Sequence, residues 1–293
     1  MESSVKLAPW SAWIILFRER IPLPVYSLLA GGIALSAQMI QLGEIHSFAL
    51  AVSFVGILAF LIELRLMDEF KDYPKDLIAH SDRPLPRKVL SPRQVEKMIY
   101  VVFVAMAGGA ALLSLAKSTA GFIYAIVVLY LWLMFKNFYL GEWLAKKPIL
   151  YAVTHQAVMI PICLFSVALE RASFIHHPPV WGWSVCLLGA FFSYEVCRKL
   201  DPKADPILET YLIAYGRSMT VGMVAILLGL AAYGAWIAEL GRLLWPLEIL
   251  LALFLSLIFL KPKAFKVVEA IAVLVLLLHL WAVPLAHALG MMV

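Results

Sequence analysis

Nine apolar segments, each close to the length that crosses a bilayer, divide the chain from end to end. A helix needs about 20 apolar residues to cross about 30 Å of hydrocarbon, and it satisfies its own backbone hydrogen bonds where lipid offers none. The sequence therefore predicts an all-α membrane protein, a single domain over residues 1–293, with nine transmembrane helices. The segments cover roughly residues 22–40, 46–66, 97–116, 119–135, 148–169, 179–197, 218–238, 243–260 and 267–289.

The composition excludes an ordinary soluble domain. The chain is 63% hydrophobic and 15% charged, whereas soluble domains average about 45–50% apolar and about 25% charged residues. Residues 1–20 hold an apolar stretch too short to span and no small-residue cleavage site, so we expect an interfacial helix anchored by Trp10 and Trp13. Cys163, Cys186 and Cys197 lack disulfide or metal spacing, and we interpret them as small buried side chains.

Basic residues are distributed unevenly between the two sides that nine spans create. Twenty-one of the 24 Lys and Arg residues fall on the side of the N-terminus and the even-numbered loops, and Lys117, Arg171 and Arg242 fall on the other. The positive-inside rule makes the first side cytoplasmic and the C-terminus external. We therefore expect an integral protein of the cell membrane (the inner membrane in a bacterium). The same bias explains the net charge of +5 without a nucleic-acid partner.

Acidic residues are concentrated in two segments on the predicted cytoplasmic side, and the positive-inside rule does not explain them, because it concerns only Lys and Arg. Seven of the 19 acids fall between Glu63 and Glu96, and four fall between Glu195 and Glu209. We predict two cytoplasmic active-site loops, over residues 67–96 and 198–217.

The first acidic cluster has a four-residue period. Asp68, Asp72 and Asp76 would share one face of a continuous helix, with about 5–6 Å between successive Cβ atoms. Like charges at that spacing destabilise a helix, but Mg²⁺, which takes oxygen ligands and is often shared with substrate phosphates, reverses this effect. Pro74 is expected to bend the helix after Asp72, which makes Asp68 and Asp72 the facing pair. The alternative is a solvated acidic loop neutralised by its own lysines.

The second cluster mixes acids with cations. Glu195 ends an apolar run, where an acid is costly without a partner, and Arg198 and Lys199 follow within one turn. Asp201 and Asp205 stand four residues apart, but a proline after each works against a long regular helix. Such a cluster offers oxygens to a metal and cations to an anion. The alternative is a helix end that neutralises itself.

These motifs resemble the UbiA superfamily of intramembrane prenyltransferases, which have nine transmembrane helices. The family's first signature, N-D-x-x-D-x-x-x-D, closes its second helix and precedes an Arg-Pro-Leu turn. Here Asp68-Glu69-x-x-Asp72-x-x-x-Asp76 follows the second span, and Arg83-Pro84-Leu85 follows in turn. Lys136 resembles the basic residue that closes the family's fourth helix. The segment 210–216 resembles the entry into its seventh helix.

The sequence departs from the family pattern at one position of the first motif and throughout the second motif. Asp68 replaces an Asn and keeps an oxygen ligand. In the second motif, the usual evenly spaced aspartates give way to Glu195, the pair Arg198-Lys199, and then Asp201 and Asp205. Which of these acids would bind a second metal is left open, and the two cations could neutralise phosphate directly.

The resemblance implies transfer of a prenyl group from an isoprenyl diphosphate to a lipophilic acceptor, aromatic or lipid, within the bilayer. It implies Mg²⁺ as cofactor, with Asp68 and Asp72 as catalytic residues. The implied metal ligands are Asp68, Glu69, Asp72, Asp76, Glu195, Asp201 and Asp205, and the implied diphosphate-binding residues are Arg83, Lys136, Arg198, Lys199 and Arg20.

His155 is the candidate for the acceptor end of the reaction. It lies eight residues into the fifth span beyond Lys147, about 12 Å deep at about 1.5 Å per residue. A polar side chain at that depth suggests a function, here taking the acceptor's proton or orienting its hydroxyl. The alternative is a hydrogen bond to a neighbouring helix.

Three other activities compete with this interpretation. A terpene cyclase on the same scaffold would ionise the diphosphate and capture the cation internally. A divalent-cation transporter would use the acids as an ion path, but it should place them at the midplane of its helices. A CDP-alcohol phosphotransferase also uses paired acids, but its Asp-Gly and Ala-Arg elements are absent around these acids.

Overall fold

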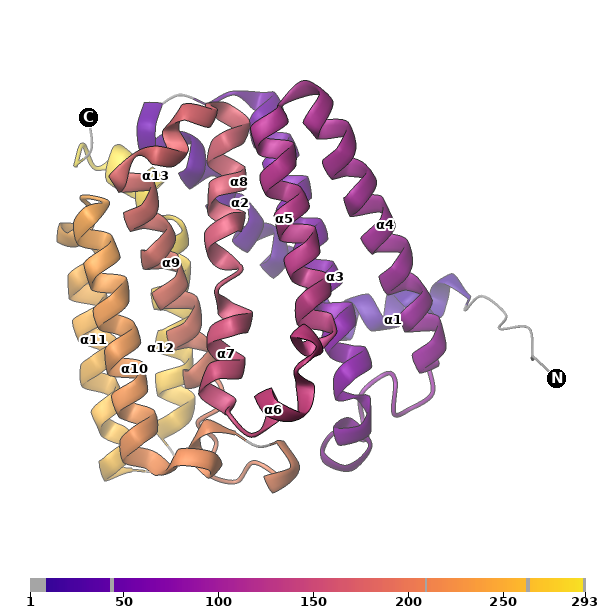
Figure 1. Cartoon of the computed structure of the whole chain (residues 1–293). Helices are drawn as coiled ribbons and strands as arrows, with labels where there is room; N and C mark the ends of the chain where they lie inside the picture. Colours follow the sequence, from indigo (N-terminus) through magenta and orange to yellow (C-terminus); the bar gives the residue numbers. More distant parts are fainter. Residues whose placement is uncertain (1–8, 43–44, 209, 262–263, 292–293) are drawn as a thin grey trace.

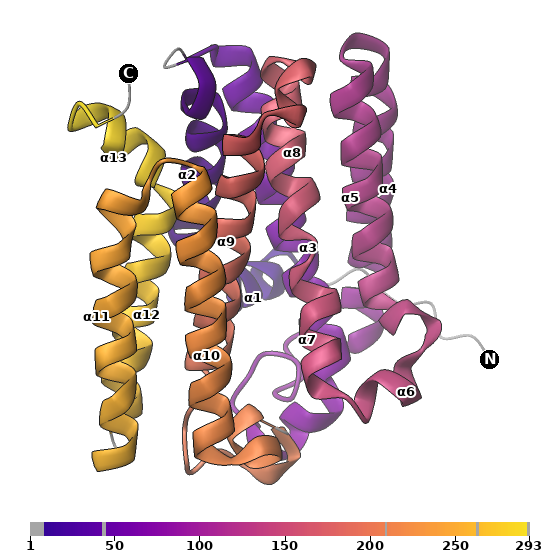
Figure 2. The same ribbon diagram turned by 60° about the vertical axis from the view of Figure 1, so that its left-hand side comes forward.

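The computed structural model describes residues 9–42, 45–208, 210–261 and 264–291, so the predictions that touched Lys6, Glu209 and Lys263 lie outside it. Long helices stand side by side (Figures 1 and 2). They are α1 (Trp10–Arg20), α2 (Leu23–Leu42), α3 (Ser47–Ala79), α4 (Pro92–Ala116), α5 (Ser118–Phe135), α6 (Gly141–Ala145), α7 (Pro148–Gln156), α8 (Met159–Glu170), α9 (Pro178–Cys197), α10 (Tyr211–Ile237), α11 (Gly241–Leu260), α12 (Phe265–Leu280) and α13 (Ala282–Ala288), with 3₁₀ turns η1 (Asn137–Tyr139), η2 (Ala172–His176) and η3 (Pro206–Leu208).

The predicted all-α membrane fold is confirmed. Within the described ranges, eight spans are long and apolar enough to cross a membrane, with α7 and α8 counted as one. The pair α12–α13, bent by 63°, makes the ninth when it is taken as one span. Helix α1 runs across the long helices (Figure 1), where the sequence predicts an interfacial helix. It buries Ala12 and Leu16 and leaves Trp10 83% exposed.

Prolines account for two of the breaks inside spans. Pro284 lacks the N–H that would bond to the carbonyl of Leu280, and the chain bends between these residues. The Ser36 hydroxyl donates to that carbonyl instead, at 2.7 Å. Pro161 has the same effect at the junction of α7 and α8, where Ile160 N–H bonds to Ala157 in a tighter turn.

Helix α3 is longer than predicted. It continues through Pro74 to Ala79, so the expected bend after Asp72 does not interrupt the helix. The loop predicted over 67–96 is therefore wrong at both ends, because the non-helical segment covers only 80–91. Helix α4 begins at Pro92 behind a Ser91–Gln94 capping box. The loop predicted over 198–217 ends earlier as well, because the Thr210 side chain caps α10.

Glycines bring α9 and α10 into backbone contact. A Cβ on Gly189 would lie 2.6 Å from the backbone nitrogen of Ala231, and Gly182 and Gly234 are equally close to the facing backbone. Small residues allow this approach where no hydrophobic force drives helices together in lipid. Gly32 on α2 is also closely packed, since a Cβ there would lie 2.9 Å from Trp281 Nε1, whereas nothing lies within 4 Å of a Cβ built on Gly108, Gly109 or Gly229.

Candidate active site at the charged end of the bundle

The two acidic clusters of the sequence meet in space at the lower end of Figure 1. Asp68 lies near the last turns of α3, and the charges that act on it come from Asp72, Arg65, Lys71 and, across the bundle, Arg198. Tyr151 on α7 lies within electrostatic reach of Asp68, Asp72 and Glu195. Helices α3, α7 and α9 therefore bring acids, cations and Tyr151 within electrostatic reach of one another.

Of the seven predicted metal ligands, Asp68 and Asp72 are the two whose carboxylates are free in the described chain. Over the described residues, neither makes a hydrogen bond or ion pair. Asp68 is half-buried and Asp72 is exposed, so their oxygens face open space rather than protein donors. The full helical turn between them puts both carboxylates on one face of α3.

Glu69 is held by arginines. Its Oε1 accepts from Arg20 Nε at 2.6 Å and lies 2.7 Å from an Arg65 nitrogen, while its side chain is 2% exposed. Burial is the main cause that lowers the pKa of Arg20 from its ordinary value, and the nearby charge of Arg65 adds to it. The second oxygen, Oε2, is buried without a partner among the described residues.

Asp76 and Arg83 bind each other. Arg83 donates to Asp76 Oδ1 at 2.6 Å, and the Asp76 side chain is 3% exposed. This pair fixes the start of the 80–91 loop, whose Leu85 is buried and whose Arg87 donates to Glu19 at 2.8 Å. In this structure, a predicted metal ligand and a predicted diphosphate-binding residue thus neutralise one another.

Glu195 ends α9 between two cations. Arg198 Nε donates to its Oε2 at 2.5 Å, and Lys199 Nζ lies 2.6 Å from its Oε1. Burial opposes the charge of Arg198, but the adjacent Glu195 carboxylate outweighs it and raises the pKa of the guanidinium. Both cations remain more than one third exposed, so they stay accessible to an anion.

Asp201 and Asp205 shape the loop between α9 and α10. Asp201 Oδ1 accepts from the backbone N–H of Lys203 at 2.8 Å, and Asp205 Oδ1 accepts from that of Ile207 at 2.9 Å. Aspartates commonly bond the backbone two residues on in turns of this kind.

Lys71 and His155 both contact Tyr151 at this end of the bundle. Lys71 Nζ donates to Asn137 Oδ1 at 2.5 Å, to Tyr151 Oη at 3.1 Å and to the Met134 carbonyl at 3.2 Å. His155 stacks on Tyr151 with ring centroids 3.9 Å apart. Its Nδ1 lies 2.8 Å from the Tyr151 carbonyl, and its Nε2 is buried with no partner in the described chain.

The turn after α5 is strained in a way that serves this site. Asn137, Phe138 and Tyr139 have φ values of 47°, 54° and 57°, in the left-handed region that costs energy for residues other than glycine. The turn brings Asn137 to Lys71 and the edge of Phe138 to the His155 ring. Lys136, just before the turn, lies over the rings of Trp132 and Phe135, 4.9 and 4.7 Å from their centroids.

Comparison with known proteins identifies the fold. No protein-family model matches the chain, and no curated protein sequence matches it. A solved structure of a digeranylgeranylglyceryl phosphate synthase, a UbiA-superfamily prenyltransferase, superposes with a TM-score of 0.61 and 18% identity over 93% of this chain and 98% of that one. The chain has the UbiA fold. The resemblance predicted from the sequence motifs is confirmed for the fold.

Within this UbiA fold, the predicted site residues divide into three groups. Asp68 and Asp72 carry free carboxylates, and Arg198, just after the end of α9 and next to Lys199, lies within electrostatic reach of Asp68. Glu69, Asp76 and Glu195 are neutralised by arginine or lysine, with Arg20 and Arg83 engaged on the protein side. Asp201 and Asp205 hold backbone turns.

Sequence reasoning missed four polar residues at this site. Arg65 and Lys71 were counted only as loop cations, and Tyr151 and Asn137 were not considered. A signal existed for three of them: Arg65 precedes Glu69 by one helical turn, Tyr151 precedes His155 by one turn, and Lys71 stands inside the acidic motif. Asn137 offered none, because its role depends on the left-handed turn.

Proposed function

We propose that this protein transfers a prenyl group from an isoprenyl diphosphate to a lipophilic acceptor inside the membrane. The observation that carries the proposal is the pair of free carboxylates, Asp68 and Asp72, opposite the exposed cations of Arg198 and Lys199 on the UbiA fold. Asp68 and Asp72 can attract a metal cation, and Arg198 and Lys199, which keep exposed surface although Glu195 pairs with them, can attract an anion, so this end of the bundle suits a metal–diphosphate pair.

The donor set fits Mg²⁺. Two carboxylates one turn apart supply hard oxygen ligands, and Mg²⁺ is commonly held by one or two carboxylates together with substrate phosphates. Asp68 and Asp72 would hold the ion, which would supply Lewis-acid stabilisation of the departing diphosphate. The other predicted metal ligands are weaker candidates for binding Mg²⁺, because each would first have to give up a hydrogen-bond or ion-pair partner in the protein. These residues are Glu69, Asp76, Glu195, Asp201 and Asp205.

The residues of the chain would then act at both ends of the prenyl donor. Arg198 and Lys199 bind diphosphate oxygens as the bond from the allylic carbon to oxygen breaks and both its electrons pass to the diphosphate. Arg20 and Arg83 are weaker candidates for this role because they are only 18% and 23% exposed, against 41% for Arg198 and 36% for Lys199. Lys136 is weaker because it lies over aromatic rings. The apolar helices around the space exclude water from the allylic cation.

His155 suits the proton that the acceptor must lose. With Nδ1–H donated to the Tyr151 carbonyl, the neutral ring keeps a lone pair on Nε2, which has no partner in the described chain. The acceptor atom forms its bond to the allylic carbon, and its proton passes to Nε2. Stacking on Tyr151 and the edge contact with Phe138 hold the ring in place.

The proposal also fixes a sidedness for the reaction. The site lies at the end of the bundle where the positive-inside rule puts the cytoplasm, so diphosphate would reach it from that compartment. Helix α13 closes the opposite end (Figure 1), consistent with an external C-terminus. Cysteine labelling of intact cells at position 82 and position 289 distinguishes the two orientations.

The direct test is incubation of the purified protein in lipid nanodiscs with a radiolabelled isoprenyl diphosphate, Mg²⁺ and a membrane lipid extract. We expect a labelled lipid product and free diphosphate, and neither when EDTA replaces Mg²⁺. A cyclic hydrocarbon formed without any acceptor would favour the cyclase instead. Flux of Mg²⁺ or Mn²⁺ into liposomes, without diphosphate release, would favour the transporter.

A further inference from the structure

A second polar cluster lies inside the bundle, away from the charged end. It consists of Cys186 on α9, Glu248 on α11 and His279 on α12, and their side chains are 1%, 4% and 0% exposed. Each residue offers one ligand atom: the Cys186 sulfur, a Glu248 carboxylate oxygen and a His279 ring nitrogen. These three atoms lie within 4.8 Å of one another. Three helices therefore bring three metal-ligating side chains to one point in an apolar setting.

Two features of the cluster point to a ligand. Glu248 Oε1 lies 3.0 Å from His279 Nε2, but the other oxygen, Oε2, is buried with no hydrogen-bond partner among the described residues. His279 Nδ1 lies 2.7 Å from the Val275 carbonyl, which fixes the tautomer and leaves Nε2 as the acceptor. Metal-ligating histidines almost always donate their other ring N–H to such a group.

Charge favours a divalent ion at this point. A thiolate and a carboxylate contribute two negative charges and the imidazole none, so a divalent ion makes the site neutral. Neutrality matters here, because isolated charges deep in a membrane protein are costly. Without an ion, Glu248 keeps an oxygen that no described donor satisfies.

We propose that Cys186, Glu248 and His279 form a binding site for a divalent transition-metal ion of the zinc class. Sulfur, nitrogen and oxygen ligands together suit Zn²⁺, and three protein ligands leave a fourth position for a water or a bound molecule. Mg²⁺, the ion proposed at Asp68 and Asp72, prefers oxygen alone, so the two sites would select different metals.

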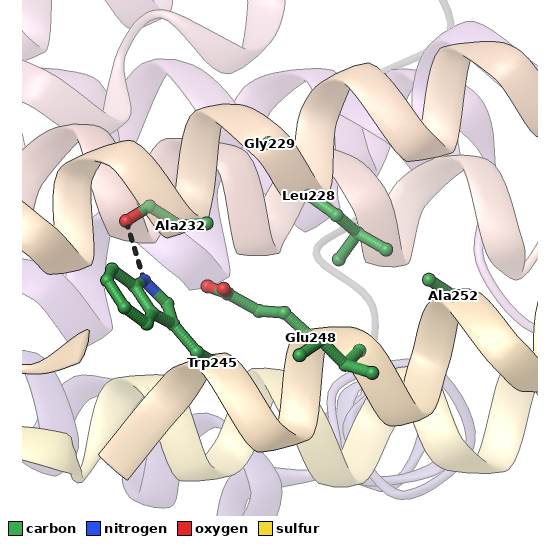
Figure 3. Close-up of a pocket in the computed structure, with 7 residues that line it drawn as sticks. Leu228, Gly229, Ala232, Trp245, Glu248 and Ala252 are labelled. Carbon is green, nitrogen blue, oxygen red and sulfur yellow. Dashed lines mark hydrogen bonds between the residues drawn. The ribbon is translucent and has the colours of Figure 1, made fainter. Parts of the chain in front are cut away.

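An apolar pocket lies beside the cluster. The pocket has a volume of about 310 Å³ and opens between α10 and α11. Figure 3 shows the Glu248 carboxylate between these helices, beside Trp245, whose indole N–H donates to the Ala232 carbonyl at 3.1 Å. Glu248 is the acid in a lining that is otherwise apolar, and it is only 4% exposed.

No motif in the sequence indicates this site. The three ligands are separated by 62 and 31 residues, and the sequence pattern around Cys186 predicts only a small buried side chain. Short metal motifs are recognisable because their ligands share one local element, whereas these ligands come from three helices.

The test uses full-length protein without a polyhistidine tag, stripped of metal in detergent and then titrated with Co²⁺. We expect one Co²⁺ per chain with a thiolate-to-cobalt absorption band. Cys186→Ser should abolish that band and, like Glu248→Gln, weaken binding by more than about 100-fold. Cys197→Ser, which changes another buried cysteine of α9, is the matched control and should keep the band.

X-ray absorption on the zinc-loaded protein provides a measurement independent of the variants. One sulfur at about 2.3 Å and nitrogen or oxygen ligands at about 2.0–2.1 Å are expected. Absence of bound metal in well-folded wild-type protein, or an unchanged cobalt band in Cys186→Ser, would overturn the proposal. The first result would leave Glu248 and His279 as a neutral hydrogen-bonded pair, and the second would place the cobalt on another cysteine.

Discussion

Asp68 on α3 lies within electrostatic reach of Arg198 at the end of α9, although 130 residues separate them in the chain. Asp68 has no direct partner within the described residues, and Arg198 is held by Glu195 with 41% of its side chain still exposed. The first cluster thus supplies free acids and the second supplies available cations. This division of roles turns two charged segments into one candidate site.

Replacing Asp72 should remove activity without unfolding the protein. Asp72 is exposed and makes no bond in the described chain, so Asp72→Asn costs the fold little. We expect Mg²⁺-dependent diphosphate release to fall by at least about 100-fold, as when a preorganised electrostatic group is lost. Released diphosphate is measured by a coupled phosphate assay, with thermal unfolding as the check on folding.

Asp205→Asn is the matched control for Asp72→Asn. It makes the same chemical change in an exposed acid of the second cluster, and the amide oxygen can still accept from the Ile207 N–H. Its activity should stay within about twofold of wild type. Near-normal diphosphate release by Asp72→Asn would contradict the assignment of Asp72 as a metal ligand.

Replacing Asp76 should affect stability first. Its buried carboxylate accepts a 2.6 Å bond from Arg83, and hydrogen bonds to charged groups contribute about 1.5–3 kcal/mol. Asp76→Asn should therefore lower the unfolding temperature. The double variant Asp76→Asn/Arg83→Gln should regain part of the loss, because it also removes the unpaired cation.

Comparing Asp76→Asn with Asp72→Asn separates a structural role of Asp76 from a catalytic one. If Asp76 only stabilises the fold, Asp76→Asn should keep diphosphate release within about tenfold of wild type at a temperature where the variant is folded. A loss as large as that of Asp72→Asn, with unchanged unfolding temperature, would restore Asp76 to the metal site.

Local patterns predicted the parts of this molecule that depend on local physics. Apolar length gave the spans, and four-residue spacing gave the facing pair Asp68 and Asp72. Long-range partners could not be predicted: Glu69 looks like a ligand in the sequence because Arg20, its partner, lies 49 residues away. Distant partners also explain why two further features could not be predicted. Asn137 bonds Lys71, 66 residues away, and the ligands Cys186, Glu248 and His279 come from three different helices.

His155 can be tested by separating release of diphosphate from transfer to the acceptor. His155→Phe keeps an aromatic ring that can stack on Tyr151 but removes Nε2. If the ring accepts the acceptor's proton, transfer should fall by about 100-fold, the low end for general-base catalysis. Hydrolytic release without acceptor should change less than threefold. If His155→Phe transfers the prenyl group at the wild-type rate, the His155 ring has only a packing role.

Helix packing gives a prediction about stability that is independent of the site. Gly189 on α9 faces the backbone of α10, so the side chain of Gly189→Leu must force the two helices apart. Overpacking of this kind costs about 1–3 kcal/mol. Gly108→Leu on α4 is the control, because nothing lies within 4 Å of its Cβ and the change should stay within about 0.5 kcal/mol. Thermal unfolding in detergent compares the two, and equal unfolding temperatures would contradict the α9–α10 contact.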